Sequence, residues 1–420
     1  MPQESRTARK REKKTITPRK WFVRLVKPNI LRFLRIRYNI SVVSSEAVKT
    51  LEPPFIMVGN HVNFWDPFFL HMDISPTIQY ITSDNIFRTK ILGTVMRLLG
   101  SIPTSKFMSD IATISQVLRI LKRKGVVGVF PEGRRTWDGR MLWHVPTVSK
   151  LIHKLKLPVV GVIIKGGYLA KPRWARHMRK GAVELEYKLV FTAEELASIS
   201  AEECRVLLEK RLYHDDMAWQ KEKMIPFPGK ALAEHIESTL FACPKCMSFN
   251  SIRSRGDEGT CSVCGYSFRH NEYGFLEPGS SPLVYDTVSE WNSWQLAHLK
   301  DFIYKQADPD RILFEEGPAA LLRGYRTRPL KRINTGRVYF SLRGIEFHTT
   351  IGRTFVFPIE EIVGENVQVG EKLEFYFGSS LYRLDFISPR VSSYMWYQCI
   401  FLLHQKIRKA AAEIDDQVNA

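Results

Sequence analysis

The stretch FIMVGNHVNFWDP, residues 55–67, determines the fold that we expect for this chain. Phe55–Val58 is apolar and predicts a short buried strand. His61 follows the end of that strand, and Asp66 comes five positions later. In an unbroken helix this spacing would separate the two side chains by about 140°. The pair therefore works best if His61 lies in a turn and Asp66 lies in or just before the first helical turn. Asp66 followed by Pro67 fits such a place, because Asp favours the N-cap and Pro the first helical position.

A histidine and a carboxylate placed in this way can transfer a proton. A neutral imidazole takes a proton from an alcohol near pH 7, and a carboxylate on its other ring nitrogen fixes the tautomer and stabilises the cation that forms. The alternative is structural: Asp66 only caps a helix, and His61 is only a turn residue. The spacing alone leaves both interpretations open.

A second segment, VVGVFPEGRRT at residues 126–136, is an apolar strand that runs into a charged turn. Arginine in a turn near a catalytic strand end suits a phosphate, which a guanidinium can bind bidentately. A third segment, GSIPTSK at residues 100–106, adds a lysine just before a predicted helix. The two segments together supply several cations that could bind an anionic substrate.

These segments resemble the motif set of the glycerophospholipid acyltransferase family, whose best-known members are the 1-acylglycerol-3-phosphate acyltransferases. The family pattern is N-H-x-x-x-x-D, then G-x-I-x-x-x-R, then F-P-E-G-T-R, then an apolar strand with prolines, and the four blocks occur in this order from Pro54 to Ile164. Lys106 stands where the second block usually has Arg. Arg134 replaces the usual Thr of the third block, which leaves Arg135 as the matching guanidinium. Gly161 replaces a frequent second Pro in the fourth block.

The resemblance implies an O-acyltransferase that transfers an acyl chain from acyl-CoA or acyl-carrier protein to 1-acylglycerol 3-phosphate and so forms phosphatidate. It implies that His61 deprotonates the glycerol 2-hydroxyl and that Asp66 orients His61. The residues implied for binding the acceptor's phosphate and shaping its turn are Lys106, Glu132, Gly133, Arg134 and Arg135. Glycerol 3-phosphate or another lysolipid are alternative acceptors. From a different class, the chain could be an inactive scaffold that binds anionic lipid or nucleic acid.

The charge of the chain agrees with work at a membrane surface. Lys and Arg number 62 against 43 Asp and Glu, which gives a formal net charge of +19. Such a field attracts polyanions. Residues 1–40, predicted as a basic arm, contain 13 of the Lys and Arg residues. Trp21–Tyr38 mixes apolar and basic residues, and we expect Pro28 to split it into two short amphipathic pieces that lie in the lipid headgroup layer. The alternative is that this arm packs on the chain's own core.

We expect no transmembrane span, because no stretch reaches 18 residues without charge. We also expect no secretory signal, because the basic start is too long and no apolar region follows it. The predicted location is the cytoplasmic face of a membrane, with the protein peripheral or monotopic. The partners predicted are an anionic membrane surface, a lysophospholipid and an acyl donor, and nucleic acid is not expected.

Between the blocks, strand and helix patterns alternate, which predicts an α/β acyltransferase domain with a mainly parallel sheet at residues 41–240. Its catalytic turns would lie at strand ends, where such sheets usually bind ligands. The predicted strands are 55–58, 78–82, 126–130 and 159–164. The predicted helices are 67–73, 87–99, 109–124, 148–155 and 193–212.

Four of the six cysteines form two C-x-x-C pairs separated by fourteen residues. This spacing predicts a four-cysteine zinc ribbon at residues 241–275, with a redox or disulfide pair as the alternative. The expected ligands are Cys243, Cys246, Cys261 and Cys264. Because protein would fill all four ligand positions, the zinc would be structural. Zinc ribbons often bind nucleic acid, which is the main support for the scaffold alternative.

Residues 280–411 change character again. A helical pattern at 291–303 precedes short alternating runs, and a final amphipathic helix is expected from about Ser392 to Ala411. The predicted strands are 337–341, 344–347, 354–357, 373–377 and 382–386. Several antiparallel strands closed by one C-terminal helix resemble a pleckstrin-homology-like barrel. Fold analogy alone does not establish a function for this part.

Overall fold

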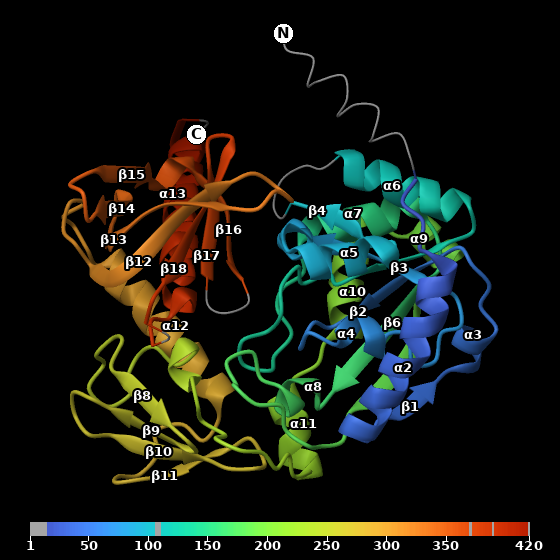
Figure 1. Cartoon of the computed structure of the whole chain (residues 1–420), viewed down its shortest axis with the longest axis horizontal. Coiled ribbons are helices and arrows are strands. Elements are labelled where there is room, and N and C mark those ends of the chain that lie inside the picture. The colour runs from blue at the N-terminus through green and yellow to red at the C-terminus, as the bar shows by residue number, and fades with distance from the viewer. Residues whose placement is uncertain (1–14, 106–110, 369–371, 389, 419–420) are drawn as a thin grey trace. The chain divides into compact units, whose positions relative to one another are not determined.

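The computed structural model describes residues 15–105, 111–368, 372–388 and 390–418. The chain forms two compact units (Figure 1). The first contains Met1–Arg173 and Met178–Gly229, and the second contains Trp174–His177 and Lys230–Ala420. The first unit thus ends at the break formed by Pro226–Gly229, while a four-residue segment from within it belongs to the second unit.

The first unit is built on a seven-stranded sheet in the order β1-β7-β6-β2-β5-β3-β4. Its strands are β1 (Ser41–Ser44), β2 (Phe55–Gly59), β3 (Ile78–Ser83), β4 (Ile102–Thr104), β5 (Val126–Val129), β6 (Val159–Lys165) and β7 (Glu184–Phe191). Neighbouring strands are parallel except β6 and β7. The sheet is therefore mixed. The four strands expected from the alternation are adjacent in the order β6-β2-β5-β3 and parallel to one another. Strands β1, β4 and β7 were not predicted.

Helices cover this sheet (Figure 1). They are α2 (Lys20–Tyr38), α3 (Glu46–Lys49), α4 (Asp66–Phe69), η1 (Asp84–Arg88), α5 (Lys90–Leu98), α6 (Ile111–Lys122), α7 (Pro146–Leu155), α8 (Gly167–Ala170), α9 (Ala193–Ser198), α10 (Ala201–Leu212) and α11 (Asp216–Lys223). Apolar residues of α7 and α10 pack with those of β2 and β6, and α6 packs on β4 and β5. Every residue of β2 and β5 is buried, which explains their nearly continuous apolar sequence.

The prediction that Pro28 divides the N-terminal arm is wrong, because α2 continues through it. A proline inside a helix costs about 3 kcal/mol or more. Contacts along the helix oppose this cost: Leu34 and Tyr38 are fully buried, and the Lys27 ammonium donates to the Ile74 carbonyl. The later half of α2 therefore packs on the unit's own core.

Two predicted helix boundaries also need correction. The expected helix 193–212 is two helices, α9 and α10, because the Ser200 side chain accepts from the Glu203 amide and the Glu203 carboxylate accepts from the Ser200 amide. This reciprocal capping starts a new helix in the middle of the predicted one. The helix expected at 67–73 is the short α4, whose N-cap is Trp65. Asp66 is thus the first helical residue, which lies within the range expected for it.

The second unit contains two antiparallel sheets (Figure 1). The four-stranded sheet has the order β11-β10-β9-β8, with β8 (Ile252–Arg255), β9 (Glu258–Cys261), β10 (Ser267–His270) and β11 (Leu276–Pro278). A buried apolar cluster under this sheet includes Trp291 of helix α12 (Val288–Tyr304) and also Trp174. The 3-10 helix η2 (Ile236–Ser238) contributes Ile236 to the same core.

The seven-stranded sheet has the order β15-β14-β13-β12-β18-β17-β16. Its strands are β12 (Phe314–Gly324), β13 (Lys331–Ser341), β14 (Gly344–Thr349), β15 (Thr354–Pro358), β16 (Ile362–Gln368), β17 (Lys372–Phe377) and β18 (Ser380–Phe386), with η3 (Ile359–Glu361) between β15 and β16. Helix α13 (Ser393–Val418) packs against β16 and β17. The sheet is a half-barrel with β15 and β16 as its edges, and the pleckstrin-homology-like assignment stays a prediction.

Candidate functional site

The site predicted from the sequence lies at the carboxyl ends of three adjacent parallel strands. β2 pairs with β5 on one side and with β6 on the other. The turns that follow β2 and β5 therefore start at the same edge of the sheet, where α/β sheets bind ligands. His61 lies in the turn after β2, and Glu132–Arg135 lies in the turn after β5.

His61 and Asp66 form a hydrogen-bonded pair. The distance from His61 Nδ1 to Asp66 Oδ2 is 2.7 Å. The Asp66 side chain is fully buried, whereas 22% of the His61 side chain is exposed. Because Asp66 accepts at Nδ1, the neutral imidazole carries its proton there and presents Nε2 as an acceptor. The ring can therefore receive a proton from a group that approaches Nε2.

The Asp66 carboxylate turns back onto the His61 turn instead of capping α4. Its oxygens accept from the backbone amides of Val62 at 2.7 Å and Asn63 at 2.9 and 3.0 Å. Burial raises the pKa of Asp66, although the hydrogen bonds from His61 and these two amides oppose the shift. N–H donors at both oxygens favour the ionised, acceptor-only form. The capping interpretation therefore does not describe Asp66.

The turn after β5 holds the backbone of His61 at both ends. Glu132 Oε1 accepts from the His61 amide at 2.6 Å, and the Thr136 amide donates to the His61 carbonyl at 2.9 Å. The Phe130 ring stacks on the imidazole with centroids 4.4 Å apart and planes 18° from parallel. The turn of the second motif, residues 126–136, therefore holds the histidine of the first motif, residues 55–67, in place.

Both carboxylate oxygens of Glu132 accept from backbone amides. Its second oxygen accepts from the Leu142 amide at 2.7 Å, and the residue is buried. Burial raises the pKa of Glu132 well above its ordinary value, although both amides oppose the shift. Gly133 follows with φ +67°, a conformation that favours glycine and allows the tight turn. Glu132 and Gly133 therefore build the turn that carries the two arginines.

Arg134 and Arg135 are half-buried within the turn that carries Glu132 and Thr136. The turn that carries them is hydrogen-bonded to the backbone of His61, and arginine in such a turn suits an anionic substrate group. Lys106, the cation predicted from the second block, lies outside the described residues. Lys171 was missed by the sequence analysis. Its pKa is lowered to about 8 by burial and by the charges of Arg179 and Arg135.

The four cysteines of the predicted ribbon gather in the second unit. Their sulfur atoms all lie within 4.8 Å of one another, and none forms a disulfide. Tetrahedral zinc with bonds of about 2.3 Å would place its sulfur ligands about 3.8 Å apart. Cys243 and Cys264 sulfurs are 3.7 Å apart, as are those of Cys246 and Cys261. The cluster is therefore compatible with zinc.

Two cysteines of this cluster, Cys246 and Cys261, have a lowered pKa. Burial would raise the pKa of Cys261, but hydrogen bonds from the Ser251 hydroxyl and from the backbone amides of Cys264 and Val263 lower it to about 6. Because the thiolate is the form that binds a metal, these donors favour metal binding at neutral pH.

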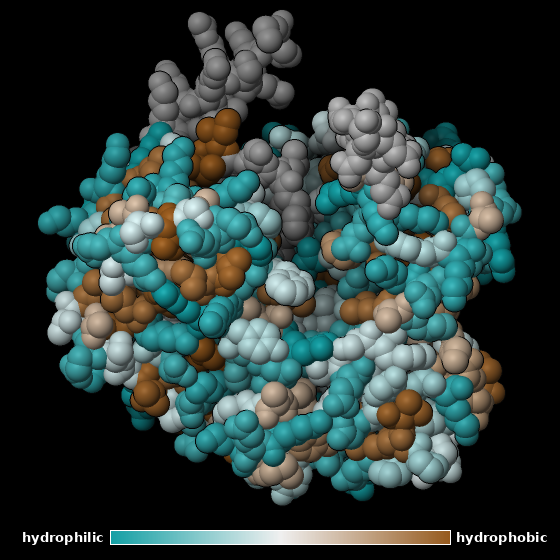
Figure 2. All heavy atoms as spheres, turned by 180° about the vertical axis from the view of Figure 1, so that it is seen from behind, coloured by the Kyte–Doolittle hydropathy of each residue, from teal (hydrophilic) through white to brown (hydrophobic). Residues whose placement is uncertain are grey.

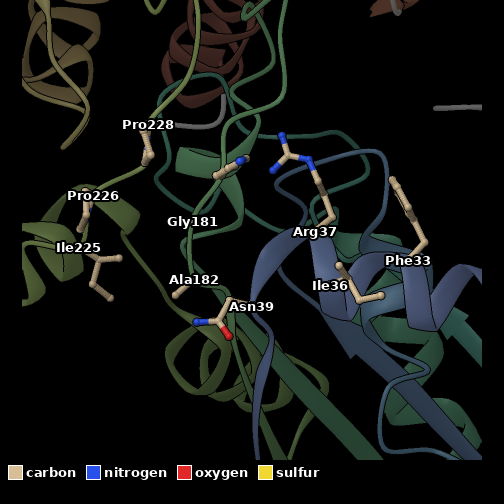
Figure 3. A pocket seen from close by; sticks show the side chains of 10 residues that line it. Phe33, Ile36, Arg37, Asn39, Gly181, Ala182, Ile225, Pro226 and Pro228 are labelled. Atoms are coloured by element: carbon tan, nitrogen blue, oxygen red, sulfur yellow. The ribbon is translucent and has the colours of Figure 1, made fainter.

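A groove of about 660 Å³ lies at the end of α2, apart from the predicted catalytic pair. Figure 3 shows Phe33, Ile36 and Arg37 projecting from α2 on one side, with Pro226 and Pro228 on the other. His61 and Asp66 do not line it. The groove combines apolar walls with two cations, Arg37 and Lys180, and no histidine or carboxylate lines it.

Residues 39–165 match the family model described as Acyltransferase. Over 131 residues the chain is 28% identical to "1-acyl-sn-glycerol-3-phosphate acyltransferase LPAT1, chloroplastic" of Arabidopsis thaliana, which covers 31% of this chain and 36% of that protein. Over 104 residues it is 25% identical to a 1-acyl-sn-glycerol-3-phosphate acyltransferase of Bacillus subtilis, which covers 24% of this chain and 52% of that protein. These matches support the glycerophospholipid acyltransferase family and the acyltransferase enzyme class.

The chain spans only about a third to a half of the length of these curated relatives. A crystal structure of the 1-acyl-sn-glycerophosphate acyltransferase PlsC of Thermotoga maritima matches 47% of this chain and 81% of its own, at 20% identity and a TM-score of 0.39. Among the described residues, no helix is both long enough and apolar enough to cross a membrane.

Proposed function

We propose that this protein transfers an acyl chain from acyl-CoA or acyl-carrier protein to the 2-hydroxyl of 1-acylglycerol 3-phosphate, giving phosphatidate. The observation that carries the proposal is the 2.7 Å bond between His61 Nδ1 and the buried Asp66 carboxylate. This bond leaves Nε2 as the acceptor on a partly exposed ring. The matched relatives bear the name of this activity, which supports the choice of acceptor.

In the proposed reaction, His61 Nε2 takes the proton of the 2-hydroxyl as its oxygen attacks the carbonyl carbon of the acyl thioester. Asp66 stabilises the imidazolium that forms. The tetrahedral intermediate then collapses, the carbon–sulfur bond breaks, and the imidazolium returns its proton to the departing thiolate. No acyl-enzyme forms, because the acceptor oxygen itself is the nucleophile.

Arg135, with Arg134, would bind the acceptor's phosphate. The turn that carries them is tied to the His61 backbone through Glu132 and Thr136. A phosphate held by this turn would bring the glycerol hydroxyl of the same molecule close to the imidazole. Such positioning of reactants can contribute several kcal/mol to lowering the barrier.

The test is an assay of purified protein with labelled acyl-CoA and a panel of acceptors. The panel contains 1-acylglycerol 3-phosphate, glycerol 3-phosphate, other lysolipids and 1-acylglycerol without phosphate. We expect the fastest transfer to 1-acylglycerol 3-phosphate. Faster transfer to another acceptor would mean that this acceptor, and not 1-acylglycerol 3-phosphate, is the substrate. Absence of transfer to all of them would favour the alternative of an inactive scaffold.

We further propose that the four cysteines hold one structural zinc ion. Zinc would crosslink the two C-x-x-C turns, and protein ligands would fill its coordination. The purified protein should carry about one zinc per chain, and Cys261→Ser should lose the metal and destabilise the second unit, because metal binding supplies folding energy. A metal-free wild-type protein with oxidised cysteine pairs would instead support the disulfide alternative.

Peripheral binding to an anionic membrane surface is also proposed. Trp21, Leu25, Arg32 and Ile36 follow one helical stripe of α2 and are all exposed, Ile36 to 76%. Exposed apolar residues also interrupt the hydrophilic surface that Figure 2 presents. Apolar anchors beside a basic residue suit the headgroup layer. Vesicle sedimentation should show weaker binding for Leu25→Ser with Ile36→Ser than for the wild type, and equal binding would contradict this orientation.

A further inference from the structure

Helix α6 covers part of the sheet of the first unit (Figure 1). The face that it turns to the sheet is apolar: Val117, Ile120 and Leu121 are buried and form a cluster with Ile102 of β4 and Val127 of β5. A surface helix that packs in this way usually carries polar residues on its opposite face. The opposite face of α6 departs from that rule.

Three large apolar residues follow one another along the opposite face of α6. Ile111, Ile114 and Leu118 are three and four positions apart, so they lie on one side of the helix. They are 82%, 46% and 40% exposed. Lys122 comes four positions after Leu118 and is exposed as well. We call these four residues the α6 stripe. Single exposed apolar residues are normal on a protein surface, whereas a row of them marks an interaction surface.

The charge around the α6 stripe is positive. From residue 85 to residue 131 the sequence has eight Lys and Arg residues and one acid, Asp110. Neither α5 nor α6 contains Asp or Glu. At the end of α6, Lys122, Arg123 and Lys124 are all exposed. Apolar anchors within a basic segment are complementary to an anionic lipid surface, which offers both hydrocarbon and negative charge.

Helix α10 of the same unit provides a contrast. Val206 of this helix is 48% exposed. The residues three and four positions away from it on either side are all charged: Glu202, Glu203, Glu209 and Lys210. Arg205 forms ion pairs with Glu202 and Glu209. The exposed surface of α10 therefore has a single apolar residue among charges of both signs, and lacks the features that suit α6 to an anionic surface.

The start of α6 lies at the edge of the sheet that carries the His61 turn. β3 is parallel to β4 and to β5, and α6 comes between β4 and β5 in the chain. A helix that connects two parallel strands runs back along the sheet, so α6 begins at the edge where β4 ends. The Thr113 hydroxyl donates to the Pro103 carbonyl at 3.0 Å, which ties the first turn of α6 to β4. Ile111, the most exposed apolar residue of the stripe, is therefore at the end of α6 that belongs to this edge.

A lipid surface fits the α6 stripe better than a protein partner does. Residues that contribute most to protein interfaces are Trp, Tyr and Arg, and the stripe contains none of these. We propose that the α6 stripe binds the headgroup layer of an anionic membrane, with Ile111, Ile114 and Leu118 as apolar anchors and Lys122 at the lipid phosphates. The inference rests on the proposed membrane binding for the identity of the partner. It adds a second surface besides α2, at the side of the sheet from which an acceptor lipid would reach His61.

The test uses two matched double variants of the whole chain. Leu118→Ser with Lys122→Glu changes the α6 stripe, and Val206→Ser with Lys210→Glu makes the corresponding changes, at the same spacing, on α10. Sedimentation measures binding to vesicles of equal parts phosphatidylcholine and phosphatidylglycerol. We expect the α6 variant to bind roughly tenfold more weakly than the wild type, because it loses an apolar anchor and reverses a charge at an anionic surface. The α10 variant should bind as the wild type does.

Two further readouts separate membrane binding from a general loss of structure. Ile111→Ser should weaken the binding that remains at high salt, because salt screens charges and does not screen the burial of apolar area. In a transfer assay, Leu118→Ser with Lys122→Glu should raise the Michaelis constant for an acceptor presented in vesicles. The Michaelis constant for a soluble short-chain acceptor should not change.

Each remaining outcome decides the question. Wild-type vesicle binding by a folded α6 variant overturns the inference, whatever Leu25→Ser with Ile36→Ser does to binding through α2. Equal losses in the α6 and α10 variants overturn it too, and so does a wild type that does not bind these vesicles. A changed oligomeric state in light scattering with unchanged vesicle binding would assign the stripe to a contact between copies of the chain. If the wild type transfers no acyl chain to any acceptor, the proposed reaction fails, and the sedimentation comparison still decides the role of α6.

Discussion

The first unit contains two histidine–aspartate pairs that look alike locally and differ in what surrounds them. In both, a ring nitrogen lies 2.7 Å from a fully buried carboxylate. In both, the carboxylate also accepts from two backbone amides: Val62 and Asn63 for Asp66, and Gly166 and Tyr168 for Asp216.

The difference lies in the ring. His61 uses Nδ1 and keeps Nε2 on a side chain that is 22% exposed, whereas His214 uses Nε2 and is 9% exposed. A general base needs a nitrogen that a substrate can reach. The comparison teaches that both carboxylates clamp nearby backbone in the same way, and that the larger exposure of the His61 ring is what distinguishes the pair suited to catalysis.

The largest expected effect tests that distinction directly. His61→Ala should lower turnover by roughly 10²–10⁴-fold, because that is the usual contribution of general base catalysis. His214→Gln, measured in parallel, should keep turnover within the same order of magnitude, since Gln can still donate to Asp216. Steady-state rates with circular dichroism as the folding control provide the measurement. Near wild-type turnover in folded His61→Ala would show that His61 is only a turn residue.

Asp216→Asn should affect stability rather than chemistry. The substitution removes the charge that three donors share, and the buried amide group would face one of them, which should lower the free energy of unfolding by about 3 kcal/mol. Urea denaturation measures the loss. A change below about 1 kcal/mol would mean that the second pair does not act as a clamp.

His71 adds a third case to the comparison of the two histidine–aspartate pairs. It is a buried histidine that has no carboxylate partner among the described residues. Burial, and secondarily the Lys27 charge, lower its pKa to about 3. A folded pKa below the unfolded value of about 6.5 means that stability is present above pH 6.5 and is lost as the pH falls toward 3. Between pH 7 and pH 5 this residue should cost about 2 kcal/mol.

His71→Phe should remove that part of the pH dependence while it keeps a ring against Tyr80, which contacts His71 at 5.8 Å between centroids. Urea denaturation of the variant and the wild type at pH 7 and pH 5 gives the comparison. Identical pH dependence in the two proteins would contradict the buried neutral state of His71.

Arg135→Ala tests whether the turn beside His61 binds phosphate. The Michaelis constant for 1-acylglycerol 3-phosphate should rise about tenfold, and that for the acyl donor should change much less, because a guanidinium–phosphate contact concerns only the acceptor. Initial rates with each substrate varied in turn measure both constants. Equal increases in the Michaelis constants for the two substrates would mean that Arg135 maintains the shape of the turn and does not bind phosphate.

Much of the site follows from local sequence. The five-residue spacing of His61 and Asp66, after an apolar strand and before a proline, predicted a turn that closes onto a short helix, and the structure has α4 starting at Asp66. The two C-x-x-C turns likewise predicted a cluster, and the four sulfurs do gather. In both cases the contacting residues are close in sequence or repeat a fixed spacing, so chain geometry alone limits where they can go.

The features that the sequence analysis predicted wrongly or did not predict have a different origin. Pro28 predicted a break in α2, but burial of Leu34 and Tyr38 outweighs the local preference. Strand β7 was not predicted, although it carries the antiparallel pairing that makes the sheet mixed. Sequence patterns report local preference, and tertiary burial of a few kcal/mol can override it.

The sequence by itself determined the α/β alternation, the strand ends that carry His61 and Arg135, and the cysteine spacing. Only the tertiary structure decided that Glu132 binds the backbone of His61 across 71 positions and that Asp216 binds α8 across 48 to 50 positions. The physical reason is that these contacts join a side chain to backbone amides distant in the chain, and no periodicity or spacing in the sequence encodes such a partner.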